Sequence, residues 1–279
     1  MAAIHWRCGA HDLDLARPAV MGIVNVTPDS FSDGGCFVDP VTATDHGRAL
    51  LAQGAAIVDV GGESTRPGAV RVAAAEESAR VLPVVAALAA SGACVSVDTR
   101  HAEVARVSIG AGASIVNDVY GFRDPAMVEV AAGCDAGVVV MHMQGEPSTM
   151  QEEPHYDDVV AEVCAFLEGQ ALRLEGAGVA AERIAVDPGI GFGKTLDHNI
   201  ALLRGLGAIA ALGYPVVVGA SRKRFVGTIS GEADPARRLG GSVAAAVYAA
   251  ELGASVLRVH DVRDTFQALS VWDALRAEG

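Results

Sequence analysis

The chain has 279 residues, of which 51% are hydrophobic and 20% are charged, and its formal net charge is −13. This composition excludes a disordered chain, and the acidic balance disfavours nucleic acid as a partner, because phosphate backbones are bound by dense Lys and Arg. No apolar run reaches membrane length, and residues 1–15 lack the apolar segment of a signal peptide, so we expect a cytoplasmic protein without membrane contact. The five cysteines are widely spaced without a C-x-x-C pair, which argues against a disulfide framework and a zinc knuckle.

The first predicted element is a hairpin in the segment IHWRCGAHDLDLARP, residues 4–18. Eight short β-branched runs follow it, at 20–26, 55–60, 94–99, 113–119, 137–142, 183–188, 215–221 and 255–261. Each run is nearly continuous in apolar character, which is typical of strands buried on both faces of a parallel sheet. The segments between them, such as 73–92 and 156–178, are rich in Ala, Leu, Glu and Arg and predict helices.

Strand and helix alternate eight times, which is the number of units in a (β/α)₈ TIM barrel. The alternative is an open doubly wound sheet, but such sheets usually have fewer strands and a dinucleotide fingerprint after the first, and here the first strand is followed by none. We therefore predict one domain over residues 1–279. In it, residues 1–19 form a hairpin extension that plugs the bottom of a barrel formed by residues 20–279.

Polar side chains stand where the predicted strands end, and in barrels the active site lies at those ends. The ends carry Asn25, Asp59, Asp98, Asn117, Met141 with His142, Asp187, Ser221 with Lys223, and Arg258 with His260. Any single Asp or Asn could be an ordinary turn former. Recognition of a ligand explains better why polar side chains gather at the strand ends.

Three of these residues indicate recognition of a flat heterocycle. Asp98, Asn117 and Asp187 come from different strands and would offer two carboxylates and an amide to one cavity. A carboxylate at Asp187 can accept two hydrogen bonds from an N–C–NH₂ edge, which guanine and pterins have. Metal ligation is a rival use, but the first strand lacks the paired histidines of barrel hydrolases, and His142 and His260 are far apart in the chain.

A second group of residues indicates anion binding. Lys223, Arg258 and His260 follow the last two strands, where barrels often bind phosphate. Asn25 is a candidate ligand for a Mg²⁺ ion bridging such oxygens, because this ion takes few protein ligands and keeps its waters. The chain has 19 arginines but only two lysines, Lys194 and Lys223. For each lysine two explanations stay open: a site that requires a compact point charge, or chance placement in an exposed loop.

The stretch DPGIGFGKT, residues 187–195, is a near miss to a phosphate-binding P-loop. The position of the first P-loop glycine is taken by Pro188, which has no N–H to offer. Two other loops, residues 27–37 and 61–70, follow the first two strands and are rich in Gly, Pro and Ser. They are either surface connections or lids over a ligand, and the embedded Phe31 and Pro67 favour lids. The small-residue helix predicted at 236–254 suits close packing, either in the core or between subunits.

Eight motifs, in order, resemble the dihydropteroate synthase family. They are MGIVNVTPDSFSDGG, GGESTRPG, SVDT, IVND, MHMQG, DPGIGFGK, GASRKRFVG and RVHDV, and they run from about residue 20 to the end. The resemblance implies a (β/α)₈ barrel, usually a homodimer, that requires Mg²⁺ and is the target of sulfonamides. Members join 6-hydroxymethyl-7,8-dihydropterin diphosphate to p-aminobenzoate and release diphosphate, giving 7,8-dihydropteroate for folate biosynthesis.

The resemblance also implies roles for individual residues. It assigns the pterin to Asp98, Asn117, Met141, Asp187, Lys223 and Arg258. It assigns the diphosphate to Asn25, Thr65, Arg258 and His260, with Asn25 as the metal ligand. It assigns p-aminobenzoate to Phe31, Ser32, Thr65, Arg66, Pro67, Phe192 and Ser221, with Asp33 in the loop that closes over it. The residues implied in catalysis are Asp33, Asp98, Lys223, Arg258 and His260.

The chemistry of this reaction favours a dissociative, SN1-like path. An arylamine is a neutral nucleophile that needs no strong base, whereas the departing diphosphate needs Mg²⁺, Arg258 and His260 to stabilise its charge. Two rival functions remain. A pterin-binding corrinoid methyltransferase would have no use for the loop that carries Phe31, and the intact site residues argue against a catalytically silent pterin-binding paralogue.

Overall fold

The computed structural model describes residues 5–27, 39–64 and 71–276. Eight parallel strands form the central sheet, in the order β8-β7-β6-β5-β4-β3-β10-β9. An isolated parallel bridge between Val186 and Val216 joins the two edges, so the sheet closes into a (β/α)₈ barrel. Every strand overlaps its predicted run. The strands are β3 (Ala19–Asn25), β4 (Ile57–Gly61), β5 (Val95–Asp98), β6 (Ile115–Asp118), β7 (Gly137–Met141), β8 (Ile184–Asp187), β9 (Val217–Val218) and β10 (Val256–Val259).

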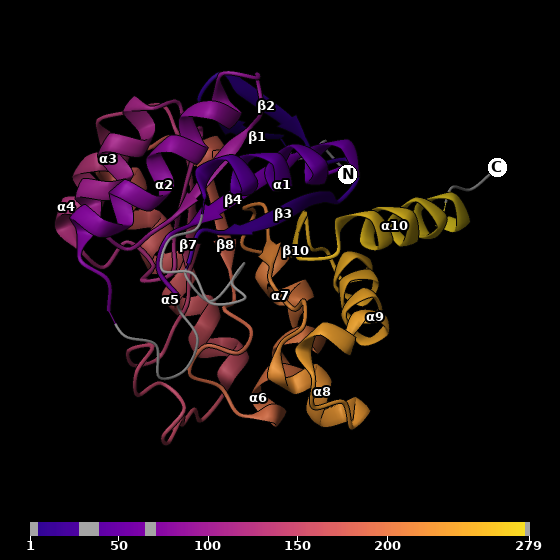
Figure 1. The fold of residues 1–279 in the computed structure, drawn as a ribbon. Coiled ribbons are helices and arrows are strands. Elements are labelled where there is room, and N and C mark those ends of the chain that lie inside the picture. The colour runs from indigo at the N-terminus through magenta and orange to yellow at the C-terminus, as the bar shows by residue number, and fades with distance from the viewer. Residues whose placement is uncertain (1–4, 28–38, 65–70, 277–279) are drawn as a thin grey trace.

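Helices connect successive strands and cover the outside of the barrel (Figure 1). They are α1 (Pro40–Ala52), α2 (Ala74–Ala89), α3 (Ala102–Gly110), α4 (Pro125–Ala132), α5 (Val159–Gly176), α6 (Leu196–Arg204), α7 (Leu206–Ala210), α8 (Arg224–Ser230), α9 (Leu239–Glu251) and α10 (Val262–Arg276), with short 3₁₀ turns at Ala181–Arg183 and Pro235–Arg237. Several begin at an aspartate cap. The carboxylate of Asp158, for example, accepts the N–H groups of Val160 and Ala161. Across the described ranges, no helix combines the length and the apolar character needed to cross a membrane.

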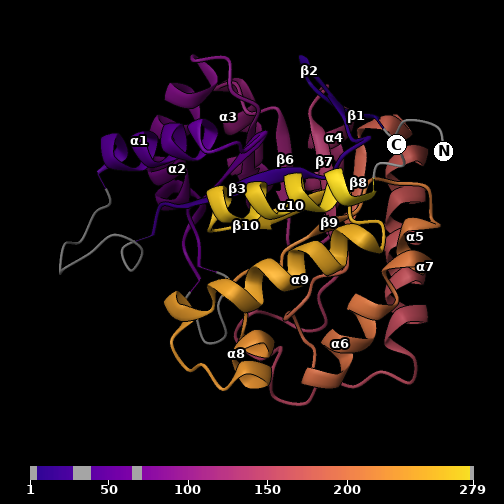
Figure 2. The same ribbon diagram turned by 90° about the vertical axis from the view of Figure 1, so that its right-hand side faces the viewer.

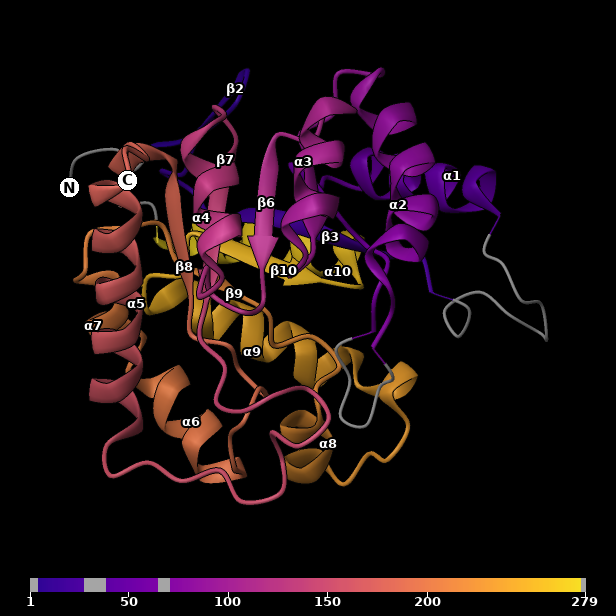
Figure 3. The same cartoon turned by 90° about the vertical axis from the view of Figure 1, so that its left-hand side faces the viewer.

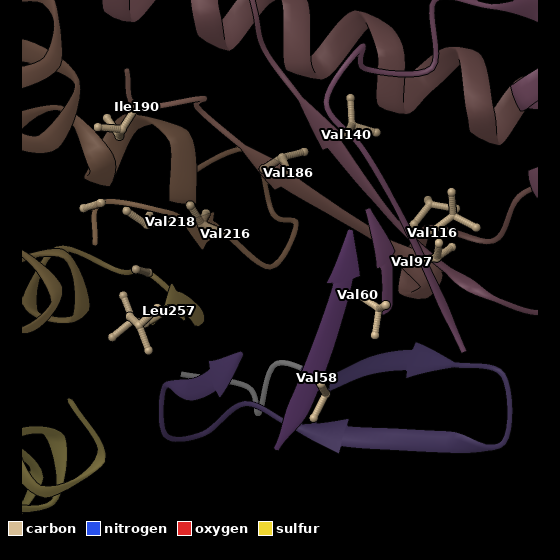
Figure 4. Packing of buried hydrophobic residues seen from close by; sticks show 14 of the residues in the cluster. Val58, Val60, Val97, Val116, Val140, Val186, Ile190, Val216, Val218 and Leu257 are labelled. Atoms are coloured by element: carbon tan, nitrogen blue, oxygen red, sulfur yellow. The ribbon is translucent and has the colours of Figure 1, made fainter. Parts of the chain in front are cut away.

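The outward side chains of the strands form the main hydrophobic core, against the helices. Because side chains alternate between the two faces of a strand, every second residue points this way. Val58, Val60, Val97, Val116 and Val140 belong to this core, and Figure 4 shows them along neighbouring strands. Burial on both faces explains why the strands are continuous apolar runs in the sequence.

The inward side chains nearest the start of each strand form a second apolar cluster, here called the bottom layer. Each of the eight strands, or the residue before it, contributes one member: Met21, Ile57, Cys94, Ile115, Val139, Ala185, Val217 and Val256. The N-terminal hairpin, β1 (His5–Cys8) paired antiparallel with β2 (His11–Asp14), packs on this layer through Trp6 and Cys8. Trp6 is fully buried, and its indole Nε1 donates to the carbonyl of Arg183 at 2.9 Å.

The hairpin therefore closes the end of the barrel where the strands begin, as the sequence predicted. In Figure 3 the hairpin lies at one end, and the arrow of β6 points to the opposite end. The C-terminal ends of the strands, where active sites of such barrels lie, are at that opposite end.

Candidate active site

Two residues beyond the bottom layer, five of the eight positions facing the interior carry a polar or ionisable side chain. We call these eight positions the middle layer: Ile23, Asp59, Ser96, Asn117, Met141, Asp187, Gly219 and Arg258. The residues two positions further along, the top layer, are Asn25, Gly61, Asp98, Val119, Met143, Gly189, Ser221 and His260; the first three end their strands, and the others follow the strand ends. Most residues predicted from strand ends thus share one interior because the side chains of a strand alternate.

Arg258 binds two carboxylates in this interior. Its Nε lies 2.6 Å from Asp59 and its Nη2 lies 2.7 Å from Asp98. The side chain of Asp59 is completely buried, whereas that of Asp98 keeps 12% of its surface exposed. Asn117 directs its amide nitrogen toward both oxygens of Asp59, at 3.4 and 3.5 Å.

Burial shifts the protonation of these groups. It raises the pKa of Asp98 above its ordinary value, although the Arg258 guanidinium opposes the shift. It also raises the pKa of Asp187, against the opposing charge of Lys223. Asp187 is held by the backbone N–H of Gly189, which donates to its Oδ1 at 2.7 Å. The interior therefore holds carboxylates that gain free energy from a positively charged or N–H-rich ligand.

Lys223 borders the same interior from the loop after β9. Its Nζ donates to the carbonyl of Ile190 and lies 4.4 Å from the centroid of the Phe192 ring. A Cβ added at Gly219 would lie 3.8 Å from the Lys223 Nζ and 3.9 Å from Arg258 Cβ, so the two cationic side chains flank this glycine. Burial lowers the pKa of Lys223 to about 8.

The backbone at Arg222 aims the residues on either side of it. Arg222 has φ of 58°, which is rare for a residue with a side chain, and its Nε pairs with Asp261 at 2.9 Å. Next to it, the Ser221 hydroxyl lies 3.1 Å from His260 Nδ1. This turn places the serine and the lysine of the SRK motif on the interior side together.

Asn25 and Asp98 lie on either side of Gly61. A Cβ added at Gly61 would lie 3.8 Å from the amide oxygen of Asn25 and 3.5 Å from Asp98 Cβ. Oxygen atoms of an amide and a carboxylate are the donors that Mg²⁺ prefers. Met141 and Phe192 belong to a separate apolar cluster with Val119, Met143 and Met150.

Six predicted site residues lie outside the described residues. They are Phe31, Ser32 and Asp33 in the loop after β3, and Thr65, Arg66 and Pro67 in the loop after β4. Their assignments stay predictions.

The loop DPGIGFGK turns tightly against the loop after β7. Gly189, Gly191 and Gly193 all have positive φ. A Cβ at Gly189 would lie 1.9 Å from the carbonyl oxygen of His142, and one at Gly193 would lie 2.4 Å from that of Gln144. Glycine is required at both positions because the two loops touch through their backbones.

Lys194, which sequence reasoning left open, is a buried structural residue. Only 3% of its surface is exposed, and its Nζ lies 3.0 Å from His142 Nδ1 and 2.9 Å from the carbonyl of Phe192. Burial lowers the pKa of Lys194 to about 7. Chance placement in an exposed loop is therefore wrong for this lysine.

One group in the described part of the chain could hold a metal ion by its ligand types: Glu63, Glu77 and His101. Arg100, however, already pairs with both oxygens of Glu63, at 2.9 and 3.0 Å. The guanidinium supplies the positive charge that a cation would bring, so this group is a weaker candidate for Mg²⁺ than the oxygens around Asn25.

Comparison with known proteins gives one family. A model described as "Pterin binding enzyme" matches residues 21–260. The dihydropteroate synthase of Neisseria meningitidis serogroup C is 48% identical over 279 residues, covering 99% of both chains.

Solved structures agree. The dihydropteroate synthase of Xanthomonas albilineans with 4-aminobenzoic acid has a TM-score of 0.94 and a sequence identity of 46%, and the match covers 100% of both chains. A structure of the enzyme from the same organism with 7,8-dihydropteroate has a TM-score of 0.90 and a sequence identity of 44%, and the match covers 99% of this chain and 100% of that one. The Yersinia pestis enzyme with a sulfonamide drug has a TM-score of 0.93 and a sequence identity of 45%, and the match covers 98% of this chain and 100% of that one.

Proposed function

The chain belongs to the dihydropteroate synthase family, and from this membership we propose that it makes 7,8-dihydropteroate. It would condense 6-hydroxymethyl-7,8-dihydropterin diphosphate with p-aminobenzoate and release diphosphate. The proposal rests on one observation: five strands, or the loops after them, bring polar side chains together in one buried interior. These side chains are Asp98, Asn117, Asp187, Lys223 and Arg258. The curated relative reported above is named a synthase, which favours this activity over methyl transfer.

Asp187, Asn117 and Asp98 would bind the pterin ring. Asp187 is 5% exposed and accepts only one backbone N–H through Oδ1 in the described structure, so its second oxygen can accept from the ring. Met141, 4% exposed, would pack against a ring face. Lys223 would lie beside the ring, since it flanks Gly219 together with Arg258.

Arg258, His260 and Asn25 would hold the diphosphate and its metal. Asp59 accepts from Nε of Arg258 and Asp98 accepts from Nη2, so each takes one of the five N–H groups of the guanidinium. The remaining N–H groups can donate to an anion. The oxygens of Asn25 and Asp98 around Gly61 fit the hard-cation chemistry of Mg²⁺, which would neutralise charge on the leaving diphosphate when bound.

Phe192, Ser221 and Lys223 would form the described part of the p-aminobenzoate site. Phe192 lies against the ammonium of Lys223, and Ser221 lies beside His260. Thr65, Arg66, Pro67, Phe31, Ser32 and Asp33 would complete the site. Because a sulfonamide is an arylamine of similar shape, we expect it to compete for this pocket.

The reaction would proceed by departure of diphosphate before full attack by the amine. Arg258 and His260 stabilise the charge that leaves with the diphosphate more strongly in the transition state than in the ground state. The buried carboxylates of Asp98 and Asp187 stabilise the positive charge that develops on the pterin methylene. No group needs to remove a proton from p-aminobenzoate before its lone pair can attack; the nitrogen loses its extra proton to water or to the departing diphosphate after the C–N bond has formed.

A direct assay tests the activity. Purified protein is supplied with Mg²⁺, the pterin diphosphate and p-aminobenzoate, and dihydropteroate and diphosphate are quantified. We expect equal amounts of both products, and inhibition by a sulfonamide that is relieved by added p-aminobenzoate. Removing Mg²⁺ should abolish binding of the diphosphate form while the bare pterin still binds in calorimetry. Tight pterin binding without any turnover would instead support a silent paralogue.

We also propose a cytoplasmic homodimer that uses α9 and α10. These helices pack on each other (Figure 2) and carry exposed apolar side chains: Tyr248 at 46%, Val271 at 57% and Leu275 at 81%. Covering such side chains is a common reason for association. Light scattering should give twice the chain mass of 28.5 kDa, and a monomeric mass at assay concentrations would contradict the proposal.

A further inference from the structure

Asp59 is a buried charge to which the assignments above give no role. Its side chain has 0% of its surface exposed, in the middle layer of the barrel. Taking a carboxylate out of water is costly unless it is paired, so a fold retains one only with compensation. Its partners lie among the residues proposed to bind substrate.

Asp59 contacts two of those residues. One oxygen, Oδ2, accepts from Arg258 Nε at 2.6 Å. The same carboxylate faces the amide nitrogen of Asn117 at 3.4 and 3.5 Å, which directs the carbonyl oxygen of that amide elsewhere. Asp59 therefore constrains the orientation of both a guanidinium and an amide.

We propose that Asp59 is a positioning residue for the reaction proposed above. It holds the Nε edge of Arg258 so that the remaining donors of the guanidinium meet the diphosphate. It also holds the amide of Asn117 so that its carbonyl oxygen meets the pterin. The inference rests on the proposed function and adds to it the residue that keeps two substrate-binding groups in place.

The difference in exposure between Asp59 and Asp98 supports this division of roles. Asp98 shares Arg258 through Nη2 at 2.7 Å but keeps 12% of its side chain exposed, so it can turn toward a ligand. Asp59 offers no surface to a ligand. When Asp98 accepts N–H groups of the pterin, Asp59 remains the fixed counter-ion of Arg258 and keeps the guanidinium from following Asp98.

The test is the substitution Asp59→Asn, which keeps the shape of the side chain and removes its charge. Calorimetry compares bare 6-hydroxymethyl-dihydropterin with its diphosphate, in the presence of Mg²⁺. We expect affinity for the diphosphate form to fall about tenfold or more beyond any loss for the bare pterin, as for a charged hydrogen bond. The KM for p-aminobenzoate should stay near its wild-type value. Equal loss for both pterins would overturn the role through Arg258.

A double-mutant cycle sharpens the result. In an Arg258→Met background, Asp59→Asn should no longer weaken the diphosphate form more than the bare pterin, because the coupled partner is gone. An undiminished effect in that background would overturn the proposal. If Asp59→Asn does not fold, Asp59→Ser, which is smaller and also neutral, takes its place in the same cycle.

The matched control is Asp118→Asn. Asp118 is 1% exposed, follows Asn117 directly, and accepts backbone N–H groups of Tyr120 and Phe122. The same chemical change there can lower stability but should leave both pterin affinities unchanged. A comparable selective loss of diphosphate binding in this control would overturn the assignment to Asp59. Failure of the wild-type protein to turn over would contradict the proposed function, while the binding cycle would still test Asp59.

Discussion

Two residues beyond the bottom layer, the barrel interior changes from wholly apolar to one that holds ionisable side chains. Ile57 in the bottom layer is followed by Asp59, and Val256 is followed by Arg258. The bottom layer buries one apolar side chain per strand under Trp6, whereas the layers beyond it bury carboxylates and cations whose pKa values burial shifts.

The difference shows that one end of the barrel serves stability and the other serves ligand binding. Apolar burial at the closed end stabilises the fold without further partners. Buried charges at the other end are at best neutral for stability, but they are preorganised for a ligand that brings opposite charge. Substitutions at the two ends should therefore separate stability from binding.

Trp6→Ala should have the largest effect and should act on stability alone. Trp6 is fully buried and donates to the Arg183 carbonyl, so its loss removes a large contact area and leaves that carbonyl without its donor. We expect the free energy of unfolding to fall by about 3–5 kcal/mol. Urea unfolding measures this change, with Trp6→Phe as the milder control. A large change in pterin affinity of the folded variant would contradict the separation of the two ends.

Stability should also depend on pH through a charge at the open end. Glu77, on α2, is fully buried, and burial raises its pKa from 4.5 to about 7. Because the folded state favours the protonated acid, this stability is fully present below pH 4.5 and is lost as the pH rises through about 7, a change of about 3 kcal/mol.

The Glu77→Gln variant isolates that contribution. Glu63, Arg80, Arg100, Thr99 and His101 surround Glu77 and are present in both proteins. Unfolding free energies measured from pH 4.5 to 8 should decline in the wild type relative to the variant. Parallel curves would show that Glu77 titrates as it does in the unfolded chain.

Asp187→Asn should weaken pterin binding and leave stability intact. The amide replaces one acceptor oxygen with a donor that faces the N–H groups of the ring, at a cost of about 1–3 kcal/mol in binding. The Oδ1 that accepts from Gly189 can be kept, and a buried charge is removed. Calorimetry measures the pterin affinity, and urea unfolding measures the stability. Unchanged pterin affinity would refute the assignment of Asp187.

Replacing a glycine by alanine at each end of the barrel should give the smallest effects. A Cβ at Gly137, under the hairpin, would lie 2.7 Å from Cys8 Sγ, whereas one at Gly61 would lie no closer than 3.5 Å to its neighbours. Gly137→Ala should lower the free energy of unfolding by about 1 kcal/mol or more. Gly61→Ala should change it by less than about 1 kcal/mol and instead weaken diphosphate binding beside Asn25. Equal destabilisation by both would contradict the layered description.

The fold could be predicted from the sequence because each strand is buried on both faces. Burial on both faces requires mostly apolar residues, as in the run 94–99. Eight such runs separated by helices predict the barrel. The hairpin was also predicted, but not its anchoring through Trp6, since nothing in the sequence links it to the 3₁₀ turn that carries Arg183.

The candidate site was predictable where a polar residue ends a strand, as with Asp187. Asp59 was noted at a strand end but given no role, because a lone aspartate there does not differ in sequence from a turn former. Its role comes from Arg258, which follows it by 199 residues. Lys194 stayed ambiguous for a similar reason, since its partner His142 belongs to another loop.

The placement of Trp6 has a consequence for how the chain reaches its folded state. The bottom layer includes Val256 on β10, so the first strand of the chain completes its contacts only after the last strand of the barrel has arrived. At a synthesis rate of roughly 5–20 residues per second, this tryptophan stays without its full environment for about ten seconds or longer. Its fluorescence would then report barrel closure, with Trp272 on α10 as the only other tryptophan of the sequence to subtract.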